Sequence, residues 1–381
     1  MSSTQRLPAA APARVLAFGT WLKNTACLLD GDAVHWSPLH GDLATVQACR
    51  ALEASAQALL DGAVGPVDAV AHDLHPDFES TRLALAYADK LGVPALAVQH
   101  HHAHIGVLQA EQGSMAPAIG LALDGVGLGT DGSAWGGELL RVDRDSFVRL
   151  AHLSPLALPG GDVAAREPWR MAAAALHSLG RGDEIVPRLA LAVGERLAAG
   201  VALLLARGLQ CPTTTSAGRW FDAIAGLLGL SVRQQAEAEA AVLLERTAAA
   251  WLDAHDPPAF AACGLDLRAL AEACLDLADR GSVGEAAALF HVGLADGLAR
   301  AAIDAARAAG TCRVLLGGGC FHNRVLTRRV AMQLEAAALE VGLVQGRGPG
   351  DAALALGQAW IAAQRVAAGR GFSSKEMLAC A

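Results

Sequence analysis

The sequence is poor in several features that mark whole classes of protein. Aromatic residues make up 4% of the 381 residues, with a single tyrosine, and charged residues only 18%. The eight cysteines form no CxxC pair, which argues against a zinc finger and suits reduced thiols in a cytoplasm. No basic run stands out and the net charge is -8, so we expect no nucleic-acid duplex as the main partner.

Uninterrupted hydrophobic runs of membrane-spanning length are also missing. The most apolar stretch, residues 189–208, is broken by Glu195 and Arg196, so we expect no transmembrane span and no membrane partner. Residues 1–13 are polar and rich in Pro and Ala, without the apolar segment of a signal peptide, and we expect a loose N-terminal tail. Together with the cysteine usage, these features predict a cytoplasmic protein.

Apolar sequence is what the chain has in abundance. Hydrophobic residues make up 53% of the chain, enough to bury a large core in two domains or two lobes. Strand-like runs and helical periodicities alternate over residues 14–115 in the order βββαβαβα, and strands restart at residues 118–123. Residues 160–256 and 267–308 are largely helical in pattern. The sequence therefore predicts an α/β, two-lobed actin-like or sugar-kinase-like (ASKHA) fold. Residues 14–115 form its first lobe, and residues 116–381 form its second lobe, which carries the helical insertions.

Four histidines fall within five positions, directly after an apolar run at residues 94–98 that reads as a strand. His100 and His104 are four apart, so on a helix they lie one above the other on the same face. That spacing lets two imidazoles bind one metal ion. His101 and His102 point off this face, and we expect them either in structural contacts or against the group that is transferred.

Glycine-rich stretches follow two of the predicted strands. Residues 124–132 form a hairpin whose backbone N–H groups can approach a phosphate closely, although a plain turn has the same composition. Residues 317–319 are three glycines between a short buried strand and a helix. This arrangement places a nucleotide at a helix N-terminus, although a simple helix entry has the same pattern. We therefore expect a nucleotide in the cleft between the lobes.

Several stretches are long enough to carry a family resemblance. From about residue 15 to about residue 363, the chain resembles the C-terminal part of HypF, the carbamoyltransferase of nickel–iron hydrogenase maturation. The resemblance is carried by residues 73–81, 98–104, 123–138, 166–170, 215–222 and 317–323. The same module resembles TsaD-type threonylcarbamoyl transferases and the O-carbamoyltransferases of antibiotic biosynthesis. Full-length HypF also carries an acylphosphatase domain, zinc-finger-like segments and a YrdC-like domain. None of these is recognised in this sequence, so we expect a natural short form or an excised domain.

The resemblance implies a reaction. In the family, the YrdC-like part makes carbamoyl-adenylate from carbamoyl phosphate and ATP, and this module passes the carbamoyl group to the C-terminal cysteine of HypE. We expect the same transfer here, with HypE as the acceptor and a YrdC-like protein supplying the intermediate. Two alternatives stay open: an O-carbamoyltransferase that acts on a small hydroxylated metabolite, and a non-catalytic nucleotide-binding subunit of a maturation complex.

The resemblance also implies the positions of the ligands. One divalent metal, Fe(II) or Zn(II), is expected on His100, His104, Asp124 and Asp351, a set of two nitrogens and two oxygens that suits either ion. Asp351 lies in a Gly-Asp-Ala-Ala turn where relatives often have Asn-Asp-Gly-Gly, so the carboxylate is kept and the turn is altered. ATP or carbamoyl-adenylate is expected against Gly125, Gly127, Gly218, Gly318, Gly319, Asp222 and Asn323.

Individual roles within the nucleotide set follow from the same resemblance. Asn323 is expected to contact adenine and Asp222 the ribose hydroxyls, in keeping with their donor and acceptor groups. Lys23 lies in the first hairpin, where phosphate is met in this architecture, although a solvated turn fits it nearly as well. Lys23, His101 and His102 are the candidate catalytic residues.

Cysteines and arginines near these motifs carry weaker expectations. Cys320 is expected to be a packing residue, because the acceptor thiol in the family belongs to the partner protein. Cys380, next to the last residue, has the position of the acceptor cysteine of HypE, but nothing else in the chain resembles HypE. Three arginines are candidates for phosphate, partner or structural contacts: Arg166, Arg170 and Arg219.

Overall fold

The first sheet joins an antiparallel meander to a parallel edge. The structure, a computed structural model, describes residues 3–261 and 264–369. The strand order in this sheet is β1-β4-β3-β2-β5-β6, in which β2, β5 and β6 run parallel and the remaining pairs are antiparallel. The strands are β1 (Ser3–Arg6), β2 (Val15–Ala17), β3 (Cys27–Asp30), β4 (Ala33–Trp36), β5 (Ala69–Asp73) and β6 (Ala95–Val98).

Residues 3–6 correct the expectation of a loose N-terminal tail. They form β1, which pairs antiparallel with β4 so that Ser3 lies opposite Trp36. The side chains of β1 are polar and mostly exposed, which suits a strand at the edge of a sheet. Leu7 and Ala11, which follow, are buried. The prediction was wrong because composition carries no information about the free hydrogen-bonding edge that β4 offers.

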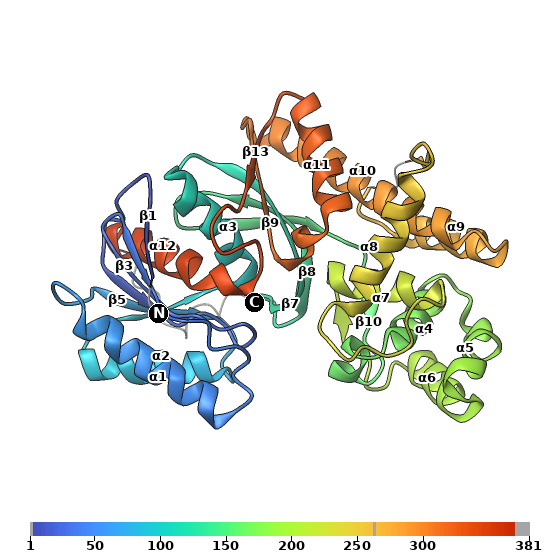
Figure 1. The fold of residues 1–381 in the computed structure, drawn as a ribbon, viewed down its shortest axis with the longest axis horizontal. Coiled ribbons are helices and arrows are strands. Elements are labelled where there is room, and N and C mark those ends of the chain that lie inside the picture. Colours follow the sequence, from blue (N-terminus) through green and yellow to red (C-terminus); the bar gives the residue numbers. More distant parts are fainter. Residues whose placement is uncertain (1–2, 262–263, 370–381) are drawn as a thin grey trace.

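Helices cover both faces of the first sheet. Successive side chains of a strand point to opposite faces, so Leu16 and Val15 in β2 enter different apolar layers. Leu16 packs with α1 (Val46–Asp61) and α2 (Glu79–Leu91), whereas Val15 packs with α12 (Leu354–Ala367). Figure 1 shows α1 and α2 on the outer side of this sheet.

The second sheet is built on a long antiparallel hairpin. Its order is β10-β11-β8-β7-β12-β13, with β9 paired to β8. β7 and β8 form the hairpin, and β12 runs parallel to both β7 and β13. The strands are β7 (Ala118–Leu128), β8 (Ala134–Val142), β9 (Phe147–His152), β10 (Leu156–Ala157), β11 (Thr213–Thr214), β12 (Arg313–Gly317) and β13 (Glu340–Leu343).

A helical body extends from the second sheet, at the end of the molecule away from the first sheet (Figure 1). Its core contains large buried side chains, among them Trp169, Trp220 and Phe290. One of its helices, α10 (Val283–Ala309), is long and apolar enough to cross a membrane, but its most apolar window is 78% buried within the protein. The helices are α4 (Pro168–Ser178), α5 (Ile185–Val193), α6 (Glu195–Arg207), α7 (Ala217–Leu227), α8 (Glu239–Leu252), α9 (Arg268–Asp279), α10 (Val283–Ala309) and α11 (Arg324–Ala336).

Two helices cross between the lobes. α3 (His100–Gln112) follows the first sheet in sequence, yet Ile105 and Leu108 on it pack against strands of the second sheet. α12 follows the second sheet in sequence, yet it packs on the first. The two helices lie in contact, and a Cβ at Gly357 would collide with the carbonyl oxygen of Ala103. The predicted two-lobed fold with helical insertions is confirmed, with the helix α12 lying on the lobe opposite to its place in sequence.

Candidate active site

Two histidines project from the first turns of α3. The helix begins at His100 because Gln99 caps it: the Gln99 Oε1 accepts a hydrogen bond of 2.9 Å from the backbone N–H of His102. His100 and His104 lie one helical turn apart on the same face, with ring centroids 4.9 Å apart. The start of the helix therefore presents two imidazoles side by side, as the spacing predicts.

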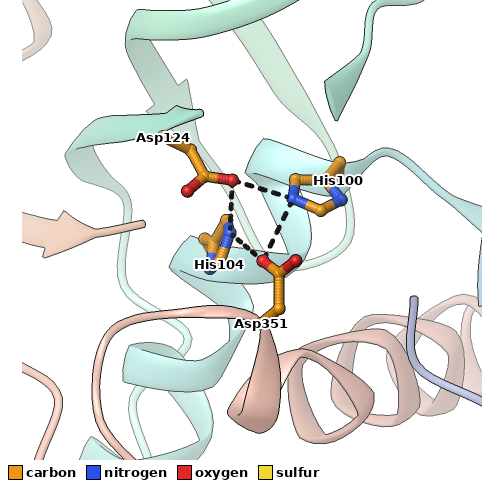
Figure 2. A group of neighbouring side chains, drawn as sticks. All are labelled: His100, His104, Asp124 and Asp351. Atoms are coloured by element: carbon orange, nitrogen blue, oxygen red, sulfur yellow. Dashed lines mark hydrogen bonds and ion pairs between the residues drawn. The ribbon is translucent and has the colours of Figure 1, made fainter. Parts of the chain in front are cut away.

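Two carboxylates reach the same point from other parts of the chain (Figure 2). Asp124 lies where the β7–β8 pairing shifts register, so its residue leaves the regular ladder. Its Oδ1 accepts a hydrogen bond of 3.0 Å from the backbone N–H of Gly319. Asp351 begins a short 3-10 helix, η4 (Asp351–Ala353), which leads into α12. The carbonyl oxygen of Ala352 accepts a 2.9 Å bond from Thr25, which ties η4 to the first lobe.

The distances between these four side chains match those around a metal ion. His100 Nε2 lies 3.1 Å from Asp124 Oδ2 and 3.5 Å from Asp351 Oδ1, and His104 Nε2 lies 3.4 and 3.5 Å from the same two atoms. Ligand atoms around a tetrahedral ion with bonds of ~2.1 Å are separated by ~3.4 Å. All four ligand atoms lie within 4.8 Å of one another, so the group fits a divalent cation.

The electrostatics of the group favour positive charge at its centre. Burial opposes a charge on His100, but the neighbouring carboxylates outweigh it, so the pKa of His100 lies well above its ordinary value. Burial likewise opposes ionisation of Asp124, but the two imidazoles hold its pKa well below the ordinary value. The carboxylates are partly open, with 12% and 13% of the Asp124 and Asp351 side chains exposed, whereas the imidazoles are enclosed. The group is therefore more open on its carboxylate side.

His101 and His102 are fully buried beside the candidate metal ligands. The Nδ1 of His101 lies 3.0 Å from the side-chain nitrogen of Gln99, and the ring of His102 packs near Phe147, with centroids 4.9 Å apart. Burial lowers the pKa of both imidazoles well below the ordinary value, so both are neutral. Neither belongs to the four-residue group, and contact of either with the transferred group stays a prediction.

Glycines of β7, of α7 and of the segment after β12 lie near Asp124. A Cβ on Gly218 would lie 3.1 Å from Gly125, and a Cβ on Gly319 would lie 2.8 Å from Asp124 Oδ1. Gly318 has a φ of 102°, which L side chains rarely adopt. Gly127 serves a different purpose: a Cβ there would lie 2.7 Å from the His100 ring, so this glycine leaves room for His100. Nucleotide contacts of these glycines stay predictions.

Asp222 and Asn323 both have protein partners. Asp222 is buried, pairs with Arg219 at 2.6 Å and accepts a 3.0 Å bond from Gln234; burial raises its pKa. Asn323 caps α11, and its Nδ2 donates to His291 Nε2 at 2.9 Å. One amide hydrogen of Asn323 remains for a ligand. The expected ribose and adenine contacts of these two residues stay predictions.

Lys23 reaches from the first lobe to the second. It adopts a left-handed backbone conformation, with a φ of 44°, and its ammonium group pairs with Glu237 at 2.9 Å. Both side chains are about half exposed, so this pair contributes little to stability. Burial opposes a charge on Lys23, but the pair with Glu237 and, less strongly, the carboxylates of Asp351 and Asp124 raise its pKa. The phosphate contact of Lys23 stays a prediction.

The cysteines and arginines named from the sequence include residues with clear structural contacts and residues without them. Cys320 packs against the main core, and burial raises the pKa of its thiol, which fits the expected packing role. Arg170 pairs with Glu167 and lies over the ring of Trp169. For Arg166, the structure does not favour any one of the phosphate, partner and structural roles. Cys380 lies outside the described residues.

Sequence comparison places the chain among known proteins. Residues 10–111 match the family model described as the HypF Kae1-like domain, and residues 120–358 match the model for the second subdomain of the carbamoyltransferase Kae1-like domain. The chain is 57% identical over 372 residues to a carbamoyltransferase HypF homolog of Cupriavidus necator, covering 95% of this chain and 94% of that protein. The chain belongs to the HypF carbamoyltransferase family. The predicted family and enzyme class are confirmed.

Other HypF proteins are longer. The carbamoyltransferase HypF of Rhizobium leguminosarum is 39% identical over 349 residues, which cover 90% of this chain and 44% of that protein. A crystal structure of full-length HypF in a phosphate- and nucleotide-bound form superposes with a TM-score of 0.87 at 29% identity, covering 97% of this chain and 58% of that one. The HypF structure from T. kodakarensis also gives 0.87 at 29% identity, covering 98% and 50%. The chain thus spans about half the length of these HypF proteins.

Proposed function

We propose that this chain binds one divalent metal, Fe(II) or Zn(II), and a carbamoyl-adenylate, and transfers the carbamoyl group to the C-terminal cysteine thiol of HypE. The observation that carries the proposal is the convergence of His100, His104, Asp124 and Asp351, whose ligand atoms lie within 4.8 Å of one another. Elements that belong to both lobes supply these residues, so the metal would lie between the lobes.

A nucleotide is expected next to this group. The HypF relative of known structure was crystallised with phosphate and nucleotide bound, which supports ATP or carbamoyl-adenylate as the ligand here. Gly125, Gly218 and Gly319 lie near Asp124, and glycine lets a phosphate approach the backbone N–H groups closely. Lys23 supplies a positive charge from the first lobe.

The residues would act chiefly by positioning and by electrostatic stabilisation. When bound, the metal supplies positive charge that polarises oxygen atoms of the intermediate. The thiolate sulfur of HypE attacks the carbamoyl carbon, a C–S bond forms, and the C–O bond to the phosphate breaks, so AMP leaves with the electron pair. The metal ion would be held by His100, His104, Asp124 and Asp351. The ammonium group of Lys23 would face the phosphate of the leaving AMP.

The wider setting is part of the same proposal. In this proposal, a YrdC-like protein supplies the carbamoyl-adenylate. Dehydration of the carbamoylated thiol would then give the thiocyanate precursor of the cyanide ligands of hydrogenase. A cytoplasmic location fits both the scattered cysteines and this role.

A reconstituted transfer reaction tests the proposal. The protein is mixed with carbamoyl phosphate, ATP and purified HypE, with and without a YrdC-like protein, and the C-terminal peptide of HypE is analysed by mass spectrometry. A carbamoylated cysteine that requires this chain supports the proposal. Transfer only to small hydroxylated acceptors favours an O-carbamoyltransferase. Nucleotide binding measured by calorimetry, without turnover of pre-made carbamoyl-adenylate, favours a non-catalytic subunit.

A further inference from the structure

A third carboxylate lies behind the candidate metal ligands. Asp73 is fully buried at the end of β5, and its Oδ2 lies 2.8 Å from the Nδ1 of His100. This is the ring nitrogen that faces away from Asp124 and Asp351, because Nε2 of the same ring faces those two residues. His100 is therefore held from both sides, by Asp73 through one nitrogen and by the metal-site carboxylates through the other.

The sheet places Asp73 there. β5 and β6 are parallel neighbours, and Asp73 lies opposite Val98, the last residue of β6. His100 follows two residues later, at the first position of α3. Because parallel strands end at the same edge of a sheet, the last residue of β5 and the first turn of α3 meet at this edge.

Hydrogen bonds fix the Asp73 residue on several sides. Its Oδ1 accepts a 3.0 Å bond from the backbone N–H of His75. Its carbonyl oxygen accepts a bond of 2.7 Å from the His72 ring and one of 3.4 Å from the Thr81 hydroxyl. The carboxylate therefore has little freedom to turn away from His100, and its burial keeps water from competing for the imidazole.

We propose that Asp73 is a positioning residue for the metal site. Its Oδ2 accepts the hydrogen of His100 Nδ1, which fixes the tautomer and the ring orientation so that the Nε2 lone pair faces the ion. A carboxylate in this position also makes the imidazole a stronger ligand. The inference rests on the proposed metal-dependent function, and it adds to that function a residue that is not itself a metal ligand.

A purely structural role for Asp73 makes a different prediction. In that case the residue serves only to end β5 through its bond to the His75 backbone N–H. An asparagine keeps one acceptor oxygen, which can serve the His75 N–H, but its NH2 group then faces His100 Nδ1 and cannot accept the imidazole hydrogen. Asp73→Asn therefore separates the two roles, since it satisfies the structural role but supplies neither the charge nor the acceptor that the positioning role needs.

Competition titration of Zn(II) against a chromophoric chelator tests the inference on the full chain. We expect Asp73→Asn to weaken Zn(II) binding about 10-fold and Asp73→Ala about 100-fold, the range measured for such outer partners. Asp77→Asn is the matched control, because it removes an exposed carboxylate from the same segment without touching His100. We expect the control to bind Zn(II) as the wild type does.

Each result decides a separate point. Binding by Asp73→Asn and Asp73→Ala within twofold of the wild type overturns the inference and leaves the proposed function standing. An equal loss in Asp77→Asn also overturns the inference, because the effect is then one of general charge. If Asp73→Ala does not fold, the isosteric Asn variant decides alone. A wild-type protein that binds no Zn(II) and no Fe(II) overturns the metal-dependent function and, with it, this inference.

Discussion

At the scale of single residues, the site depends on side chains that have no room to move. His104 is 1% exposed, and its Nε2 lies 3.4 Å from Asp124 Oδ2 and 3.5 Å from Asp351 Oδ1. Substituting it removes one of only two nitrogen ligands, whereas His100 and the two carboxylates remain. The metal would then be held by three side chains. One of them is Asp351, which lies in the turn that differs from that of the relatives.

His104→Ala is expected to abolish both metal retention and carbamoyl transfer. The loss of affinity should exceed the roughly 10- to 100-fold that removal of an outer partner costs, because a direct ligand is lost. Metal content after gel filtration and the transfer assay with HypE measure the two effects. His177→Ala, an exposed histidine in α4, is the control. Wild-type transfer by His104→Ala without detectable metal would refute the assignment.

Two glycines near the end of β7 offer a matched pair. A Cβ at Gly127 would lie 2.7 Å from the His100 ring, whereas a Cβ at Gly125 meets nothing within 4 Å. Gly127→Ala must displace His100 and should weaken metal binding about 10-fold, since forcing atoms into a packed site typically costs about 1–3 kcal/mol. Gly125→Ala should bind metal normally. Equal metal affinities of the two variants, measured by chelator competition, would contradict this packing argument.

At the scale of elements, the junction of α10 and α11 contains a neutral buried histidine. His291 Nδ1 lies 2.8 Å from the carbonyl oxygen of Ala287, and Nε2 accepts from Asn323. Burial lowers the pKa of His291 to about 4, from an ordinary value of 6.5. Protonation would turn the acceptor nitrogen into a donor facing the Asn323 amide, so the folded protein resists it.

Acid should therefore destabilise this junction. Between about pH 6.5 and pH 4 the unfolded chain takes up a proton that the folded protein does not, so the free energy of unfolding falls as the pH falls. The loss from this group is on the order of 3 kcal/mol. Urea unfolding of the wild type and of His291→Gln across this range measures it. The stability difference between the two should shrink toward pH 4, and a constant difference would show that His291 stays out of the acid response.

The sequence could predict most individual elements but not the contacts between them. Local periodicity and spacing were enough for the short strands, the helical insertions and the His100–His104 face, because each depends on neighbours within one element. They were not enough for Asp73, whose approach to His100 requires the parallel register of β5 and β6. They also failed for residues 3–6, whose strand exists only because β4 has a free edge.

At the scale of the whole molecule, the candidate metal joins parts that fold around different sheets. Asp124 belongs to the second sheet, whereas Asp351 precedes α12, which packs on the first sheet. Gly19 and Gln358 exchange two buried hydrogen bonds, of 2.9 and 3.1 Å, which hold α12 against the first lobe. Periodicity within single elements could not show this crossing of α12, because the contacts join opposite ends of the chain.

Metal binding should therefore stabilise the folded molecule as a whole. An ion that binds only the folded protein adds ~2.7 kcal/mol when its free concentration is 100 times its dissociation constant. Thermal unfolding with Zn(II) should show a higher midpoint than unfolding with a chelator, and Asp351→Asn should lose most of the difference. An increase that persists in Asp351→Asn would mean that the ion binds elsewhere.

X-ray absorption spectroscopy of the Zn(II)-loaded protein tests the central claim most directly. The protein should bind one ion per chain, with two imidazole nitrogens and two carboxylate oxygens among its ligands at about 2.0–2.2 Å. His104→Ala should lose this signal. A sulfur ligand at about 2.3 Å, or a first shell without imidazole, would show that the metal binds away from His100, His104, Asp124 and Asp351.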